Sequence, residues 1–274
     1  LTTEIYSQLV GIAKPRLGNV NITLLDGETI SLNDQVLADQ IAALASTTNW
    51  QQITTNNAPS ARYLYGLAYD SNRQVTVLFG GDNTGYSRLN DTWEYDGTDW
   101  QQIFPAQSPP GRVNIDQTLV FDTNRNKTIL FGGLGQYSYL NDTWEYDGTT
   151  WTEVDTPVSP VARDAHAMAY DSGRNKTVLF GGYQNSYTYL NDTWEYDGVN
   201  WSKIAATPAP SARWAHALVY DPLKGVVLLF GGYVPPLGKQ VNDTWTYDGI
   251  AWLKLTLAQS PSIREQHVLV FDGS

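Results

Sequence analysis

Three histidines and several tyrosines are the residues of this 274-residue chain that could do chemistry. The histidines each stand three residues after an arginine, and they recur about every fifty residues, at His166, His216 and His267. Three imidazoles converging on one point could bind a metal ion through nitrogen atoms about 2.0 to 2.1 Å away. Side chains along an extended strand alternate in direction, however, so equivalent histidines on successive strands need not point at one axis. We therefore expect packed, hydrogen-bonded histidines and no metal.

A second candidate site is a set of tyrosine-rich loops. Each loop runs from a Phe-Gly-Gly phrase to an Asn-Asp-Thr-Trp phrase, and the first of them reads GGDNTGYSRLN. Tyrosine combines a large ring with a hydroxyl at low entropic cost, so these loops could stack on sugar rings or anchor a peptide. The alternative is that the rings only cover packing surfaces beneath them. The candidate binding residues in the loops are Tyr86, Arg88, Tyr137, Tyr139, Tyr183, Tyr187, Tyr189 and Tyr233.

The residue that follows each repeated arginine changes from one repeat to the next. In order, it is Tyr63, Val113, Asp164, Trp214 and Glu265. Packing favours the same residue at equivalent positions, whereas ligand binding favours differences, so all of these except Val113 join the candidate binding residues. Asp164 and Glu265 could form a carboxylate pair, which would suit an enzyme. No nucleophile or metal-ligand signature accompanies them, so we assign no catalytic residue and no cofactor.

These residues owe their spacing to an internal repeat of about fifty residues. The phrase Asn-Asp-Thr-Trp recurs at intervals of 51, 50 and 51 residues, beginning at Asn90, Asn141, Asn191 and Asn242. Each period contains four short extended runs, which in the first are 61–70, 75–81, 89–96 and 100–103. An Asp-Gly pair before the fourth run suits a tight hairpin turn, because glycine adopts positive φ readily. The repeat therefore predicts four antiparallel strands per period.

These motifs resemble the kelch family of β-propellers, whose repeat carries a double glycine, a tyrosine and a tryptophan on successive strands. The resemblance covers residues 50–271. It implies an all-β propeller of four-stranded antiparallel blades, with a binding face formed by the loops between second and third strands. Trp93 and Tyr95 share one face of their strand by period-two alternation, so we expect them to pack between blades. The copper and cysteine-linked tyrosine of kelch-like galactose oxidases are excluded, because the chain has no cysteine.

The two ends of the chain indicate how such a ring would close. The fifth repeat stops after one expected strand at 263–272, whereas TNWQQI at 48–53 nearly copies TDWQQI at 98–103. Residues 19–34 read as a hairpin about Asp26-Gly27, and residues 34–46 as a short helix.

We therefore predict a five-bladed propeller closed by N-terminal strands. Residues 1–49 would form an arm with the hairpin and the helix, and residues 50–274 would carry the propeller repeats. Two alternatives remain open. The chain could be part of a six- or seven-bladed propeller, or its arm could pair with another subunit.

Composition limits the partners and the location. A net charge of -11 argues against nucleic acid, whose phosphates attract clustered Lys and Arg, and no run approaches the roughly 18 apolar residues of a membrane span. The lack of cysteine and the abundance of Asn, Thr, Tyr and Trp resemble secreted bacterial proteins, so we predict an extracellular or cell-surface location. The function predicted is non-catalytic binding of protein or glycan. The alternatives are a structural subunit that self-associates through its arm, and a carbohydrate-active enzyme.

Overall fold

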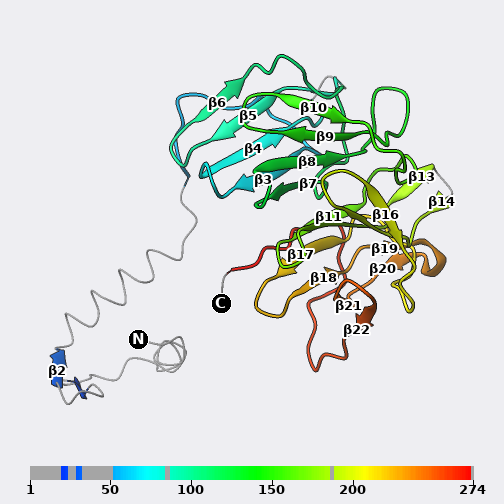
Figure 1. The fold of residues 1–274 in the computed structure, drawn as a ribbon. Coiled ribbons are helices and arrows are strands. Elements are labelled where there is room, and N and C mark those ends of the chain that lie inside the picture. Colours follow the sequence, from blue (N-terminus) through cyan, green and yellow to red (C-terminus); the bar gives the residue numbers. More distant parts are fainter. Residues whose placement is uncertain (1–19, 24–28, 33–51, 84–86, 186–187, 273–274) are drawn as a thin grey trace. The chain divides into compact units, whose positions relative to one another are not determined.

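The computed structural model describes residues 20–23, 29–32, 52–83, 87–185 and 188–272 (Figure 1). The chain divides into two units, residues 1–54 and residues 55–274. No helix among the described residues is long and apolar enough to cross a membrane.

The described backbone of the first unit is one hairpin. Strand β1 (Val20–Thr23) pairs antiparallel with β2 (Thr29–Leu32), and Val20 lies opposite Leu32. Both strands fall inside the run of residues 19–34 whose alternation predicts a hairpin. The helix predicted at 34–46 lies outside the described residues.

The second unit contains four antiparallel sheets of four strands each, and these are the blades of a β-propeller. The first blade is β3 (Gly66–Asp70), β4 (Val75–Phe79), β5 (Thr92–Tyr95) and β6 (Trp100–Ile103). The second is β7 (Leu119–Asp122), β8 (Lys127–Phe131), β9 (Thr143–Tyr146) and β10 (Trp151–Val154). The third is β11 (Ala167–Asp171), β12 (Lys176–Phe180), β15 (Thr193–Tyr196) and β16 (Trp201–Ile204). The fourth is β17 (Ala217–Asp221), β18 (Val226–Phe230), β21 (Thr244–Tyr247) and β22 (Trp252–Lys254).

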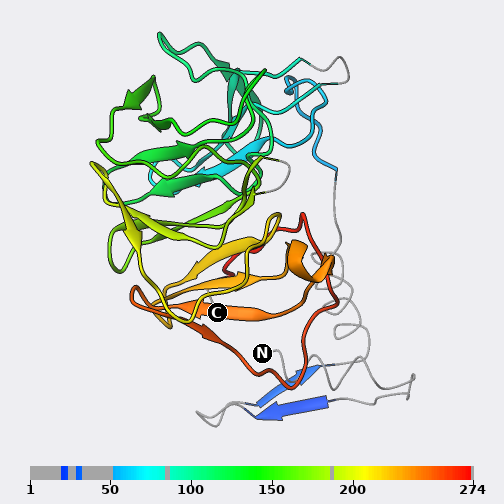
Figure 2. The same ribbon diagram turned by 90° about the vertical axis from the view of Figure 1, so that its right-hand side faces the viewer.

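The predicted all-β fold of four-stranded blades is thus confirmed. Figure 2 shows the blades following one another in chain order, and the first strands β3, β7, β11 and β17 are successive neighbours. These first strands are therefore innermost. A short two-stranded ribbon extends one loop in each of the third and fourth blades. In the third blade it is β13 (Tyr183–Asn185) with β14 (Thr188–Tyr189). In the fourth it is β19 (Tyr233–Val234) with β20 (Lys239–Gln240), joined by the 3₁₀ turn η1 (Pro235–Leu237).

Aspartates fix the turns at which these strands end. The carboxylate of Asp70 accepts hydrogen bonds from the backbone N–H groups of Asn72 and Arg73, both at 3.0 Å, and so closes the turn between β3 and β4. The Asp-Gly turn after β5 uses Asp96 in the same way, with acceptor distances of 2.8 and 2.9 Å to the N–H groups of Thr98 and Asp99. Short polar side chains of this kind favour turns because they bond their own backbone.

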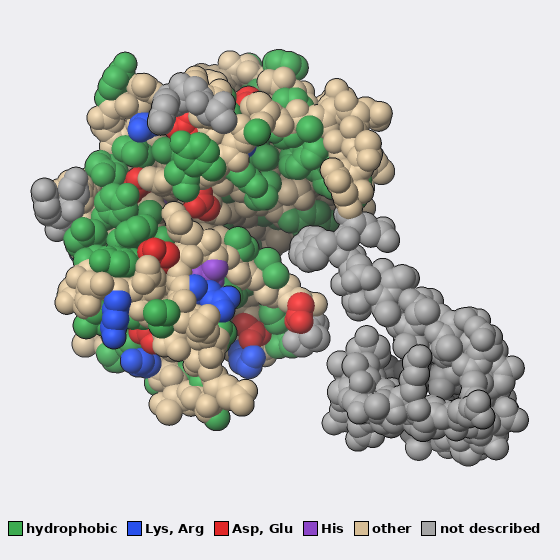
Figure 3. Space-filling model, turned by 180° about the vertical axis from the view of Figure 1, so that it is seen from behind, with side chains coloured by type: hydrophobic (Ala, Val, Ile, Leu, Met, Phe, Trp, Pro, Cys, Tyr) green, Lys and Arg blue, Asp and Glu red, His purple; other side chains and the backbone are tan. Residues whose placement is uncertain are grey.

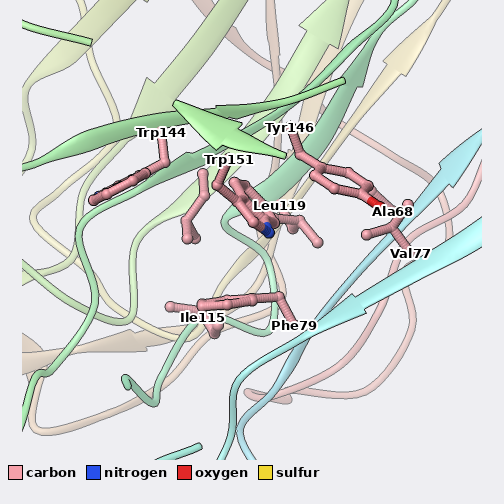
Figure 4. Packing of buried hydrophobic residues seen from close by; sticks show 9 residues of the cluster. Ala68, Val77, Phe79, Ile115, Leu119, Trp144, Tyr146 and Trp151 are labelled. Atoms are coloured by element: carbon pink, nitrogen blue, oxygen red, sulfur yellow. The ribbon is translucent and has the colours of Figure 1, made fainter. Parts of the chain in front are cut away.

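The seams between blades hold the hydrophobic core. In the seam between the first two blades, the Trp151 ring lies between Phe79 and Tyr146, with ring centroids 5.1 and 5.0 Å away (Figure 4). Its indole N–H donates to the Thr92 hydroxyl of the preceding blade at 2.9 Å. The next two seams repeat this hydrogen bond with Trp201 and Trp252. The expected packing of strand aromatics between blades is confirmed there, because burying such rings removes a large apolar area from water.

The first blade departs from this pattern on one face. Trp93, Tyr95 and Trp100 are only partly buried, whereas Trp151 and Tyr146 are 0% and 1% exposed. The Tyr95 hydroxyl has no hydrogen-bond partner among the described residues. This face has no blade against it in the described part of the chain.

The repeated arginines hold the loops together. Arg163 donates two hydrogen bonds to the carboxylate of Asp192, at 2.7 and 2.9 Å, and one to the Gly181 carbonyl at 3.0 Å. The same Asp192 carboxylate accepts the indole N–H of Trp194 at 2.7 Å. Equivalent bonds recur in the other three complete repeats, so these arginines have a structural role.

The fifth repeat keeps the backbone pattern but not the strand. Residues 263–272 form no ladder, because a strand needs a partner and none lies beside them among the described residues. Even so, the Gln266 N–H donates to the Ala215 carbonyl at 2.9 Å, as the Ala215 N–H does to Ala165 at 3.0 Å. Val268 and Val270 line a channel of about 800 Å³ together with the four inner strands.

Candidate binding site on the loop face

The structure brings the two sets of candidate residues together. Each residue after a repeated arginine pairs through its backbone with the loop that follows the double glycine, so that Asp164 bridges Tyr183 and Trp214 bridges Tyr233. The second glycine allows this approach. Gly182 has a φ of +86°, and a Cβ there would lie 2.5 Å from the Asp164 carbonyl oxygen. We call the surface formed by these bridged residues the loop face.

An aromatic cluster lies on the loop face. The Tyr183 ring meets Tyr139 and Trp214 edge to face, both with centroids 5.8 Å apart, and lies 6.2 Å from Tyr189. Trp214 in turn lies 5.4 Å from Tyr233. All five rings are partly buried, so the cluster still presents ring surface to solvent. Figure 3 shows the propeller unit from behind. Hydrophobic side chains gather on this side of the unit, with single acidic side chains among them.

Asp164 lies beneath this cluster and is fully buried, with 0% exposure. Its Oδ2 accepts a hydrogen bond from the Asn114 amide at 2.5 Å, and the carboxylate also accepts one from the Tyr183 hydroxyl. Burial raises the pKa of Asp164 to about 6, against the lowering effect of these bonds and of the nearby Arg88 charge. Its Oδ1 has no partner among the described residues.

The pKa values of other groups around Asp164 are also shifted. The pKa of Tyr183 is raised, first by burial and then by the negative charge of Asp164. The pKa of Tyr139 is raised for the same two reasons. Asp116 also has a raised pKa because protein surrounds it, although its side chain is exposed to water in the channel mouth, which moderates the shift. The site is therefore a low-dielectric, negatively charged pocket walled by aromatic rings.

A cavity of about 160 Å³ opens beside these residues and is lined by Asn114, Asp116, Tyr183 and Trp214. Its floor includes residues with left-handed backbone, which recur at the second position after each repeated arginine: Leu64, Asn114, Ala165, Ala215 and Gln266, with φ of 49 to 57°. A non-glycine residue in this region is strained, so the surrounding hydrogen bonds must hold it there. Sequence reasoning missed Asn114 and Asp116. The signal for Asn114 was available, since asparagine tolerates positive φ better than the leucine or alanine found in other repeats.

The three histidines also line this cavity, from deeper positions in the repeats. His166 and His216 are buried in seams, edge to face with Phe131 and Phe180 at 5.6 and 5.5 Å. Burial lowers the pKa of both, to about 3 for His216, so both are neutral near pH 7. Within the described ranges no three His, Cys, Asp or Glu side chains lie close enough together to hold a metal ion.

Several candidate residues lie outside the aromatic cluster. Tyr137 is 95% exposed and Tyr63 is 49% exposed. The carboxylate suggested as a partner for Asp164 bonds elsewhere, because Glu265 accepts from the Gln240 amide at 3.0 Å. Arg88 lies on the loop face, where its backbone bridges Asp82. Tyr86 and Tyr187 fall outside the described residues.

Two overlapping stretches of the chain, residues 21–205 and 149–274, match the family model described as the KLHDC2/KLHL20/DRC7 Kelch-repeats domain. This chain belongs to the kelch-repeat family. Kelch-repeat propellers typically serve as protein-interaction modules, which agrees with a site that offers aromatic surface.

Similar proteins come from plants. A putative adagio-like protein 2 from Oryza sativa subsp. japonica is 32% identical over 140 residues, which are 48% of this chain and 21% of that protein. Adagio protein 3 from Arabidopsis thaliana is 31% identical over 99 residues, or 33% of this chain and 16% of that protein. An F-box/kelch-repeat protein from the same plant is 29% identical over 139 residues, or 45% and 28%. The matched part thus spans less than a third of each relative.

Proposed function

We propose that this chain is a protein-binding module whose partner docks on the loop face against Tyr183 and Trp214. The observation that carries this proposal is the break in the repeat at this face: a different residue follows each repeated arginine, and the rings beside it stay partly exposed. The seam aromatics, in contrast, repeat and are buried. Amphipathic rings around a charged pocket are typical of protein-interaction surfaces.

The experiment is selection of peptides from a random displayed library by the intact chain, followed by affinity measurements with variants. Trp214→Ala and Tyr183→Ala are each expected to weaken the selected peptides at least tenfold, because each removes ring area at the centre of the surface. Ile250→Ala is the matched control, since Ile250 is equally apolar and 79% exposed but lies in the turn between β21 and β22, at the other end of the blade. Equal binding to all three variants would contradict the proposal.

Glycan binding, self-association and location are further proposals that rest on composition and on the ring faces alone. Exposed tyrosine and tryptophan rings can stack on sugars, so a glycan array tests the first. The second and third proposals are that the chain is a secreted protein of bacterial type and that it forms an extracellular assembly through residues 1–49. The intact chain should then form oligomers that are lost when the arm is deleted. A monomer in light scattering at all concentrations would rule the assembly out.

We also propose that residues 20–34 and 48–53 complete a fifth blade. The uncovered face of the first blade supports this, as does Arg264, whose guanidinium bonds Ser262 and no aspartate among the described residues, while the other repeated arginines each bond an aspartate. In sequence, Leu32-Asn33-Asp34 matches the Leu-Asn-Asp phrase that supplies those aspartates, such as Asp91. Asp34 is therefore the counter-ion proposed for Arg264.

A double-mutant cycle of Asp34→Asn and Arg264→Ala in the full chain tests closure. The two changes should couple by more than about 1 kcal/mol in the free energy of unfolding, because each leaves the other charge unpaired. Additive effects would exclude this pairing. A coupling that appears only at high protein concentration would instead indicate an arm exchanged between subunits.

A further inference from the structure

The buried charge on the loop face points to the kind of group that binds there. Five of the six other buried acidic side chains form ion pairs with arginine or lysine, and they are Asp70, Asp122, Asp171, Glu195 and Asp221. Asp164 is as buried as any of them, yet among the described residues the side-chain groups that donate to it are the neutral ones of Asn114 and Tyr183. A buried carboxylate without a cation is costly, because it has lost its hydration and gained no counter-charge.

The positive group nearby does not pair with Asp164. The charge of Arg88 acts on Asp164 from a distance, but within the described part of the chain the two form no ion pair. Arg88 Nη1 is buried and has no hydrogen-bond partner among the described residues. Asp82, which bridges Arg88 through the backbone, is also buried and has an unpartnered Oδ1 among the described residues. Two acidic oxygens at this face, Asp164 Oδ1 and Asp82 Oδ1, therefore lack partners among the described residues.

The rings over Asp164 favour a cation as well. The face of an aromatic ring carries negative charge density, and an ammonium or guanidinium within about 6 Å of its centre is attracted to it. Tyr183 joins the two features, since its hydroxyl donates to Asp164 while its ring contacts Tyr139 and Trp214. A cation seated on these rings would feel both the ring and the carboxylate behind it, with little water between them to screen the charges.

We propose that the loop face accepts the side chain of an arginine or lysine presented by a protein partner, seated on Tyr183 and Trp214 with Asp164 as its counter-charge. This inference rests on the proposed function and specifies the partner's chemistry. Asp116 at the mouth of the adjoining cavity adds a second negative charge along the approach. The net charge of -11 favours the encounter with a basic segment by long-range attraction.

The test uses peptides selected by the intact chain, acetylated and amidated so that their termini carry no charge. The selected peptides should share an arginine or lysine at one position. Replacing an arginine there by citrulline, which keeps the shape but not the charge, should weaken binding at least tenfold. Asp164→Asn should weaken the charged peptide by a similar factor and leave the citrulline peptide unchanged. Glu153→Gln, an exposed change on β10, is the control for net charge and should change neither.

The outcomes separate this inference from the function on which it rests. Two outcomes would overturn the inference and leave the protein-binding proposal standing. In the first, the selected peptides need Trp214 but lack a basic residue. In the second, they bind Asp164→Asn and the parent chain equally. Peptides that bind Trp214→Ala and Tyr183→Ala as well as the parent would overturn both. If Asp164→Asn unfolds, the citrulline series on the parent chain still decides whether the charge is recognised.

Discussion

Two adjacent residues, Arg163 and Asp164, show how differently this chain treats the charges that hold its loops together and the charge on its loop face. Arg163 is fully buried, and its guanidinium makes four hydrogen bonds, two of them to the Asp192 carboxylate. Asp164 is equally buried but has one oxygen without a partner among the described residues. The arginine recurs in every repeat, whereas the residue after it changes each time.

This contrast separates stability from binding at the level of single side chains. A buried ion pair that is fully hydrogen-bonded holds a loop in one geometry, so repetition serves it well. A buried carboxylate without a counter-ion destabilises the fold, and chains keep such groups mainly where a ligand uses them. The following substitutions test this contrast, because each alters either a group that stabilises the fold or a group on the loop face.

The largest effect is expected from removing one of the arginines that hold the loops together. Arg163→Met should lower the free energy of unfolding by about 3 to 5 kcal/mol, because it leaves the Asp192 carboxylate buried and unpaired. Urea unfolding of the intact chain measures this. Lys176→Met is the matched control, since its 3.5 Å pair with Asp197 is largely exposed and should contribute below about 1 kcal/mol. Similar losses in both variants would contradict the distinction between anchored and exposed pairs.

Removing the charge on the loop face should have the opposite sign. The folded-state pKa of Asp164, about 6, lies above the unfolded value of 3.8, so the ionised form destabilises the fold above pH 6 and this cost vanishes below pH 3.8. Asp164→Asn should therefore stabilise the chain at pH 7 by up to about 3 kcal/mol, and by almost nothing at pH 4.

Thermal unfolding at the two pH values checks this prediction. Asp192→Asn is the control, because its ion pair with Arg163 lowers the pKa of Asp192 and the same chemical change should destabilise the chain at pH 7. Destabilisation by Asp164→Asn at pH 7 would mean that the loop-face carboxylate is a structural group after all.

The residues that pack in the seams were predictable from the sequence. The residues of the loop face were predictable only in part. Repetition reveals seam residues, because Trp151, Trp201 and Trp252 perform one task three times and the alternation along a strand assigns their face. Deviation from the repeat identified Asp164 and Trp214. It could not identify Asn114 as their neighbour, because that contact joins consecutive repeats through the folded backbone.

Other misses also have physical causes. Tyr95 carries the same motif as the buried Tyr146, Tyr196 and Tyr247 but stays partly exposed, because its burial depends on a neighbouring blade. The expected strand at 263–272 keeps the local turn geometry of its repeat without a ladder, because hydrogen bonds between strands need a second strand. Local motifs thus predicted local shape, whereas exposure and pairing depended on neighbours that the motif does not contain.

A smaller effect is expected from the neutral seam histidines as pH falls. The folded-state pKa of His216, about 3, lies below the unfolded value of 6.5, so the unfolded chain binds the proton more readily between these values. The contribution of this histidine to the free energy of unfolding is therefore fully present above pH 6.5 and is lost as the pH falls toward 3. For one such histidine the loss is about 2 kcal/mol between pH 6.5 and 5. His216→Gln should flatten this slope relative to the parent, in which Asp164 acts in the opposite direction. His267→Gln, at a half-buried site, should flatten it less.

The smallest effect compares one hydroxyl in a closed seam with its equivalent at the uncovered face. The Tyr247 hydroxyl is buried and donates to Glu195 at 2.9 Å, so Tyr247→Phe should cost about 1 to 2 kcal/mol through loss of a hydrogen bond to a charged acceptor. The Tyr95 hydroxyl has no partner among the described residues, so Tyr95→Phe should change stability by less than about 0.5 kcal/mol, or raise it. Chemical denaturation of both variants measures the difference. Equal costs would show that a carboxylate reaches the Tyr95 hydroxyl and that this face of the first blade is covered.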